Sequence, residues 1–281
     1  MRLKEPYGLF VDPAGKIYVG DSGTRIVRMD DITGTNWISY GKSGDAIGQF
    51  NWPTDIFVDS TGKIYVVDHQ NNRIVRMDDI SGSNWITYGS LGTGIGQFGY
   101  PLAIFVDSGG KIYVVEQDNN RIVRMDDMNG TNWISFGSYG REKGQFVEPA
   151  GIFVDSGGKI YVADKSNNRI VRMDDMSGAN WTTYGSIGNG IGKFTSPTGI
   201  FVDSGGKIYV ADSDNNRIVR MDDMSGTNWT TYGSVGSGTG SFDRPFRVVV
   251  DSGGKIYVCD TNNYRIVRID DMSGSNWKSF P

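Results

Sequence analysis

The chain has 281 residues, with 28 Lys and Arg against 32 Asp and Glu, so its formal net charge is −4. Proteins that neutralise nucleic-acid phosphates carry a basic excess or stripe, so a nucleic-acid partner is not expected. No stretch reaches the about 18 consecutive apolar residues of a membrane span, and residues 1–6 lack the apolar core of a signal peptide. A trimmed leader would leave the same chain, so the compartment stays open. Cys259 is the single cysteine, which excludes a disulfide within the chain.

One unit is repeated six times along the chain. A tryptophan preceded by asparagine recurs every 48 residues, and a Gly-Lys-Ile-Tyr-Val run keeps the same period except for a first interval of 47. A repeat of this size, built from strand-like pieces, is typical of propellers and solenoids. The recurring tryptophans are Trp37, Trp85, Trp133, Trp181, Trp229 and Trp277.

The fifth unit illustrates the elements of every repeat in chain order. Residues 199–203, 208–212, 217–221 and 229–232 form four short β-branched and aromatic runs. Asp, Asn, Ser and Gly separate the runs and indicate turns. The first two runs are almost continuously apolar, which predicts strands buried on both faces. No segment has the spacing of an amphipathic helix.

Four antiparallel strands in each of six repeats predict an all-β, six-bladed β-propeller in which each blade is one contiguous 48-residue repeat. We expect a single domain over residues 1–281. The approximate blades are 1–52, 53–100, 101–148, 149–196, 197–244 and 245–281. The chain begins before an innermost strand and ends after an outermost one, so blade one should close the ring by packing on blade six.

Residues 199–221, GIFVDSGGKIYVADSDNNRIVRM, resemble an NHL repeat, and the resemblance extends over all six units. It implies a six-bladed NHL propeller. Domains of this kind serve as protein-binding, RNA-binding or sensor modules. The extended segment before each periodic tryptophan departs from the NHL pattern and lengthens the turn before the outer strand.

Comparison of the repeats separates scaffold from candidate site. The turns after the first and third strands barely vary, whereas the turn after the second strand and the connection into the next blade differ from repeat to repeat. In an up-and-down blade these two variable segments lie on one face. Because loops on a rigid scaffold carry function, we predict a ligand site there. The candidate ligand contacts are Trp52, Asp55, His69, Tyr100, Glu116, Glu148, Arg244, Phe246 and Arg247.

Other recurring residues are interpreted as structural. We expect the periodic tryptophans to fill gaps between blades, and the Asp that ends each second strand to pair with the Arg that begins the third. Trp52 lies outside the periodic register and, with Tyr7, Tyr100 and Phe246, could form an aromatic rim for a ligand or pack locally over its loop. Arg247 and Arg244 could bind an anion or pair with Asp55 or Glu5.

Metal chemistry has little support in the sequence. His69 is the only histidine, which excludes a zinc site made of three histidines. Six-bladed hydrolases and lactonases related to the NHL type hold calcium in their channel, and Asp55, Glu116 and Glu148 are the weak counterparts that this chain offers. We expect no cofactor, and we interpret Cys259 as a small buried apolar residue.

The sequence therefore predicts a non-enzymatic scaffold, expected to be a monomer, that binds a protein, a peptide or a small polar ligand on the variable face. Two alternatives stay open. One is a calcium-dependent hydrolase or lactonase. The other is a repeat-amplified or engineered ring without a selected ligand.

Overall fold

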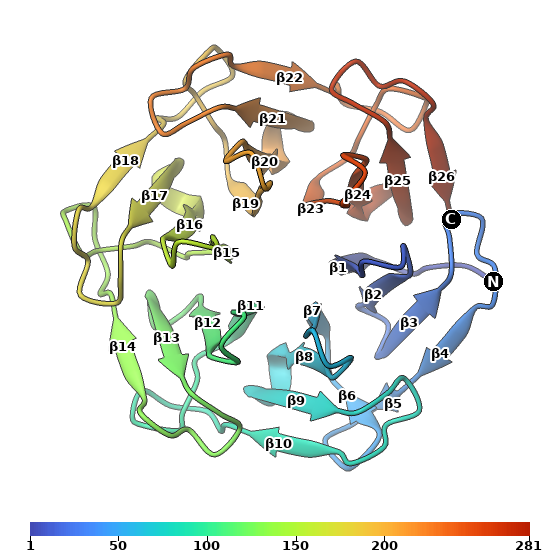
Figure 1. Ribbon diagram of the computed structural model, residues 1–281, viewed down its shortest axis with the longest axis vertical. Coiled ribbons are helices and arrows are strands. Elements are labelled where there is room, and N and C mark those ends of the chain that lie inside the picture. The colour runs from blue at the N-terminus through green and yellow to red at the C-terminus, as the bar shows by residue number, and fades with distance from the viewer.

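The computed structural model describes residues 1–281 and contains six four-stranded antiparallel sheets around a central axis (Figure 1). In every sheet the strands follow chain order from the axis to the rim, so each blade is one continuous repeat, as predicted. The protein is thus a six-bladed β-propeller. The structure contains no helix with the length and apolar character needed to cross a bilayer.

The strands occupy matching positions in all blades. The innermost strands are β1 (Pro6–Val11), β7 (Pro53–Val58), β11 (Pro101–Val106), β15 (Gly151–Val154), β19 (Pro197–Val202) and β23 (Pro245–Val250). The second strands are β2 (Ile17–Asp21), β8 (Ile64–Asp68), β12 (Ile112–Glu116), β16 (Ile160–Asp164), β20 (Ile208–Asp212) and β24 (Ile256–Asp260). The third strands are β3 (Arg25–Met29), β9 (Arg73–Met77), β13 (Arg121–Met125), β17 (Arg169–Met173), β21 (Arg217–Met221) and β25 (Arg265–Ile269). The outermost strands are β4 (Ile38–Tyr40), β10 (Ile86–Tyr88), β14 (Ile134–Phe136), β18 (Thr182–Tyr184), β22 (Thr230–Tyr232) and β26 (Lys278–Phe280).

Short elements join these strands. In four blades the turn after the second strand is a single 3-10 turn, namely η1 (His69–Asn71), η2 (Lys165–Asn167), η3 (Ser213–Asn215) and η4 (Thr261–Asn263). A small parallel pair, β5 (Lys42–Ser43) and β6 (Gln49–Phe50), lies in the first connection. Blade one has four steps from Asp21 to Arg25, where blade two has five from Asp68 to Arg73. This shorter turn accounts for the first interval of 47 residues.

Burial explains why the repeats assemble. All five residues of each second strand are buried, whereas the outermost strands are largely exposed. The buried apolar side chains form six clusters, one at each interface between neighbouring blades. A fully buried Val, Leu or Ile side chain contributes about 1.5–3 kcal/mol, so each blade is stabilised mainly by its two neighbours.

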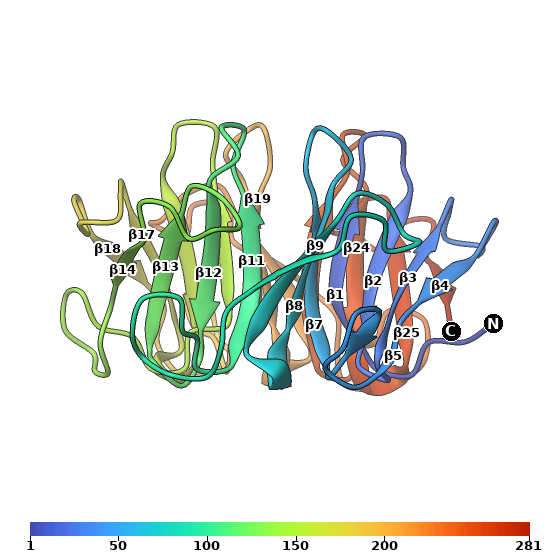
Figure 2. The ribbon, with the colours of Figure 1, turned by 90° about the horizontal axis from the view of Figure 1, so that it is seen from below.

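The ring closes by packing of blade one on blade six, as predicted. Their shared cluster has 12 buried residues, as many as the largest of the other interfaces, and includes Leu3 and Cys259. The backbone N–H of Leu3 donates to the carbonyl of Pro281 at 3.1 Å, and the two termini lie side by side (Figures 1 and 2). Thr261 Oγ1 donates to the carbonyl of Pro6 at 2.7 Å. We call this interface the closing seam.

In each blade a buried acid–arginine pair holds the turn after the second strand against the segment that precedes the first strand. The register places Asp68 opposite Arg73. Asp68 Oδ2 accepts from Arg73 Nε at 2.7 Å and from Asn71 Nδ2 at 2.8 Å, while Oδ1 accepts from the backbone N–H of Asn51 at 2.7 Å. Burial raises the pKa of Asp68 despite these donors. The equivalent pairs are Asp21–Arg25, Glu116–Arg121, Asp164–Arg169, Asp212–Arg217 and Asp260–Arg265.

The six periodic tryptophans lie between blades, as predicted, but they are half-buried. Trp85 packs on Phe50 and Tyr40 of the preceding repeat, with ring centroids 5.1 and 6.2 Å apart. The guanidinium of Arg73 lies over the ring of Trp85, 6.0 Å from its centroid. Each tryptophan thus contacts both an aromatic ring and the arginine of the buried pair.

Candidate functional site

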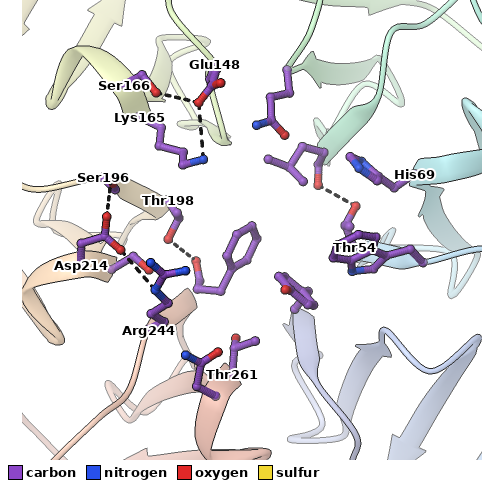
Figure 3. Close-up of a pocket in the computed structure, with 17 residues that line it drawn as sticks. Thr54, His69, Glu148, Lys165, Ser166, Ser196, Thr198, Asp214, Arg244 and Thr261 are labelled. Atoms are coloured by element: carbon purple, nitrogen blue, oxygen red, sulfur yellow. Dashed lines mark hydrogen bonds and ion pairs between the residues drawn. The ribbon is translucent and has the colours of Figure 1, made fainter. Parts of the chain in front are cut away.

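A cavity of about 410 Å³ opens where the turns after the second strands meet the connections between blades. These two segments lie together because they bond to each other; for example, the N–H of His69 donates to the carbonyl of Trp52 at 3.2 Å. We call this side of the disc the variable face, and Figure 3 shows the pocket that opens on it.

Seventeen residues from three repeat positions line the pocket. The starts of the innermost strands contribute Tyr7, Thr54, Leu102, Thr198 and Phe246. The turns after the second strands contribute His69, Gln117, Lys165, Ser166, Ser213, Asp214, Thr261 and Asn262. The connections contribute Trp52, Glu148, Ser196 and Arg244.

The connection residues reach the pocket through an unusual backbone conformation. Trp52, Tyr100, Glu148, Ser196 and Arg244 each precede a proline and have φ between 48 and 60°. For four of the five, an asparagine side chain of the preceding blade accepts a hydrogen bond from the backbone N–H, as Asn168 Oδ1 does from Ser196 at 3.0 Å. Four of the five side chains, those of Trp52, Glu148, Ser196 and Arg244, line the pocket.

Five aromatic rings follow one another on the variable face, the first four of them in the pocket lining, and we call them the aromatic arc. They run in the order Phe246, Tyr7, Trp52, His69 and Tyr100, with successive centroids 4.8, 5.7, 5.6 and 5.2 Å apart. The first three contacts are edge-to-face, with interplanar angles of 70–74°. Edge-to-face pairs stabilise one another by about 0.5–1.5 kcal/mol beyond burial, so the arc is a preorganised wall.

Two acid-centred clusters occupy another part of the lining, and we call them the charged arc. Glu148 Oε2 accepts from Ser166 Oγ at 2.7 Å and lies 3.6 Å from Lys165 Nζ. One blade further, Asp214 accepts from Ser196 Oγ at 2.7 Å and lies 3.4 Å from Arg244 Nε. The two clusters hold two acidic and two basic groups, so their formal charges cancel.

His69 is the only residue of the aromatic arc whose side chain ordinarily titrates near neutral pH. Its Nδ1 lies 2.9 Å from the carbonyl oxygen of Pro101, which requires a proton on Nδ1 and leaves Nε2 as an acceptor. Burial lowers the pKa of His69, although the Pro101 carbonyl opposes the shift. The ring is therefore neutral at physiological pH.

Of the nine candidate contacts, Trp52, His69, Glu148, Arg244 and Phe246 line the pocket. Tyr100 stacks on His69 at the end of the aromatic arc, outside the lining.

The other three candidates have internal partners. Asp55 and Arg247 lie one residue further along their innermost strands and form a buried ion pair at 2.9 Å. Glu116 is fully buried at the position of Asp68 and pairs with Arg121 at 2.6 Å. Each of these charged groups is paired inside the protein, and none of the three residues lines the pocket, although Arg247 Nε is buried without a partner.

The three carboxylates considered for calcium are consequently separated. Asp55 pairs with Arg247, Glu116 with Arg121, and Glu148 with Lys165. The structure has no group of three or more His, Cys, Asp or Glu side chains placed to share a metal ion.

Thr54, Leu102 and Thr198 line the pocket but were not selected, although Tyr7 and Phe246 at the equivalent position of other blades were considered. The residue directly after the recurrent proline is Tyr7, Thr54, Leu102, Ala150, Thr198 or Phe246, and most of these face the pocket. Its variation from blade to blade was the signal that could have identified it. Lys165 and Asp214 lie in turns recognised as variable but were not selected.

The fold and the blade pattern define the class of this protein as a propeller of NHL-type blades, and an NHL repeat model matches residues 242–269. A family model described as Tachylectin matches residues 19–223, which is most of the chain. The chain belongs to the Tachylectin family. None of the curated protein sequences compared with it matches.

Solved structures share the fold at low identity. Virginiamycin B lyase from Staphylococcus aureus aligns with a TM-score of 0.66 and 18% identity, covering 100% of this chain and 87% of the lyase. A Bacteroides thetaiotaomicron protein of unknown function aligns with a TM-score of 0.71 and 14% identity, covering 99% and 70%. A chain of the nidogen/laminin complex aligns with a TM-score of 0.61 and 18% identity, covering 78% and 76%. These likenesses concern the fold.

Proposed function

We propose that the protein is a non-enzymatic binding module and that its ligand, a small polar molecule or a polar segment of a protein or peptide, occupies the pocket on the variable face. The observation that carries the proposal is the identity of the left-handed residues that line the pocket, namely Trp52, Glu148, Ser196 and Arg244. The pocket volume, about 410 Å³, lies within the about 300–1,000 Å³ of small-molecule sites.

The left-handed conformation costs a residue with a side chain about 1–2 kcal/mol, least for Asn and nothing for Gly. Elsewhere most such non-glycine positions hold Asn, as Asn72 and Asn84 with φ of 52° illustrate; Thr24 and Tyr264 are the exceptions. At the rim the same conformation is adopted by Trp52, Glu148 and Arg244, among others. Side chains kept where the backbone favours Gly or Asn support a role for the side chains themselves.

The balance of charges indicates which ligands suit the pocket. Glu148 and Asp214 offset Lys165 and Arg244, and His69 is neutral. A strongly charged ligand would therefore meet like charges as well as opposite ones. A neutral or zwitterionic molecule fits this balance.

Two of the matches suit a binding module. The family carries the name of a lectin, and lectins are proteins that bind sugars. The nidogen-containing match comes from a complex between two proteins, which agrees with propellers acting as interaction modules.

A second candidate function is enzymatic. His69 presents an unprotonated Nε2 beside the pocket, as a general base requires. Among the structural matches is a catalytically inactive histidine-to-alanine variant of virginiamycin B lyase with quinupristin, at 19% identity and a TM-score of 0.66. Incubation with quinupristin followed by mass spectrometry tests this candidate. If the protein converts quinupristin and His69→Ala abolishes the conversion, the enzymatic function replaces the binding proposal.

The binding proposal is tested by saturation-transfer NMR with four probes: N-acetylglucosamine, L-tryptophan, citrate and spermidine. We expect transfer to the neutral or the zwitterionic probe, and its loss in the double variant Trp52→Ala/Arg244→Ala, with circular dichroism establishing that the variant is folded. Transfer to none of the four probes, or transfer that the double variant leaves intact, would overturn the proposal.

A further inference from the structure

The pocket is built asymmetrically, although it lies on a ring of nearly identical blades. The aromatic arc comes from blades six, one and two and ends at the connection into blade three, whereas the charged arc runs from the connection into blade four to the connection into blade six. Figure 3 shows Glu148, Lys165, Asp214 and Arg244 on one side of the opening and His69 on the other.

The charged arc presents both signs of charge within one region. Lys165 and Arg244 offer donors to an anion, while Glu148 and Asp214 offer acceptors to a cation. No acidic or basic side chain of the lining lies within the aromatic arc, because His69 is neutral. A ligand that satisfies this arrangement carries its positive and negative groups at one end and an apolar group at the other.

Breaking the ion pairs of the charged arc to admit a ligand costs little free energy. The side chains of Glu148 and Arg244 are 49% and 64% exposed. Exposed ion pairs contribute about 0–1 kcal/mol, so exchanging their partners for those of a ligand loses little. The buried Asp55–Arg247 pair, by contrast, is not placed to exchange.

The aromatic arc supplies the complementary wall. Trp52 and Phe246 are half-buried, and the indole Nε1 of Trp52 is buried without a hydrogen-bond partner. A planar apolar group placed against these rings would gain about 25 cal/mol for each Å² removed from water.

We propose that the pocket binds a free α-amino acid with an aromatic or other large apolar side chain, its ammonium and carboxylate groups on the charged arc and its side chain on the aromatic arc. This inference rests on the proposed function and names its ligand class. Zwitterions with widely separated charges fit less well, because one of their charges would face the aromatic arc.

Isothermal titration with L-tryptophan and four analogues tests the assignment. Tryptamine lacks the carboxylate, indole-3-propionate lacks the ammonium, N-acetyl-L-tryptophanamide lacks both charges, and glycine lacks the apolar group. We expect L-tryptophan to bind at least about tenfold more tightly than each analogue, which corresponds to a difference in binding free energy of at least about 1.4 kcal/mol. Equal affinity for L-tryptophan and N-acetyl-L-tryptophanamide would overturn the inference.

Variants of the lining residues test which end of the ligand contacts the charged arc and which contacts the aromatic arc. Lys165→Gln and Arg244→Gln are expected to weaken L-tryptophan binding by about tenfold or less while leaving N-acetyl-L-tryptophanamide unaffected. Trp52→Ala should weaken both, and Lys207→Gln, an exposed lysine in a turn after a first strand, should change neither. Melting temperatures establish that each variant is folded.

The outcomes separate this inference from the proposed function. If N-acetylglucosamine binds in a Trp52-dependent manner and no amino acid does, the amino-acid assignment is wrong and the binding module stands. If neither binds and citrate and spermidine also fail, both proposals are wrong.

Discussion

The Nη2 atom of Arg247 lies 2.9 Å from Oδ2 of Asp55, with 9% and 1% of the two side chains exposed. Asp55 is on β7 of blade two and Arg247 is on β23 of blade six, so the pair spans blade one. Blade one has Gly8 at the equivalent position, and a Cβ atom there would lie 2.6 Å from the Cα atom of Asp55. The missing side chain allows the pair to bridge the closing seam.

Removing one partner of this pair should destabilise the protein strongly. Asp55→Ala and Arg247→Ala each leave an unpaired buried charge, which costs about 3–5 kcal/mol. The double variant should lose less than the sum, because no charge remains unpaired and blade three already carries Ala103 at this position. Urea unfolding measures these free energies. Arg244→Ala, which removes an exposed pair, should cost less than about 1 kcal/mol; additive losses in the double variant would contradict this account.

The same pair predicts a pH dependence of stability. Burial raises the pKa of Asp55 from its ordinary value to about 6, although Arg247 and two backbone N–H groups oppose the shift. The folded protein then holds this proton more tightly than the unfolded chain. Its contribution to stability is therefore largest at low pH and declines as the pH rises from about 4 to about 6. The stability difference between the native protein and Asp55→Ala/Arg247→Ala should follow this decline and be flat above about pH 7; a flat difference throughout would refute it.

Cys259 should report on opening of the closing seam. It is fully buried in the cluster shared by blades six and one, with its Sγ 3.7 Å from the carbonyl oxygen of Gly8. Burial also raises the pKa of the thiol. We expect no reaction with a thiol reagent in the native state. Leu3→Ala, in the same cluster, should accelerate labelling more than Ile200→Ala, which lies between blades four and five; equal acceleration would mean that labelling requires global unfolding.

The periodic tryptophans should stabilise the ring moderately. Trp181 lies between the ring of Phe146, at 5.3 Å, and the guanidinium of Arg169, at 5.9 Å, and is half-buried. Truncating a buried tryptophan costs about 3–5 kcal/mol, so Trp181→Ala should cost roughly half of that. Ile191→Ala, at a site that is 80% exposed, is the matched control with a change below about 0.5 kcal/mol. Denaturant unfolding distinguishes them, and equal effects would show that the tryptophans are not inter-blade packing residues.

Residue variation among repeats was informative about where a site lies and less so about what each residue does. Trp52 and Arg244 differ from their counterparts in other blades and line the pocket. Glu116 also differs, because every other blade has Asp there, but its longer side chain makes the same buried contact to an arginine. A substitution that preserves a contact and one that creates a site look alike when only the repeats are compared.

The sequence by itself determined the number of blades, their strand order and the manner of ring closure, because these depend on local runs of apolar residues and on a period that the chain repeats. Only the tertiary structure decided which variable residues share the pocket and which neutralise one another. Asp55 and Arg247 are far apart in the chain, and their pairing depends on how the curvature of the ring brings blades two and six together across a glycine. The short distance between Asp55 and Arg247 in space is a property of the closed ring, and no local sequence pattern encodes it.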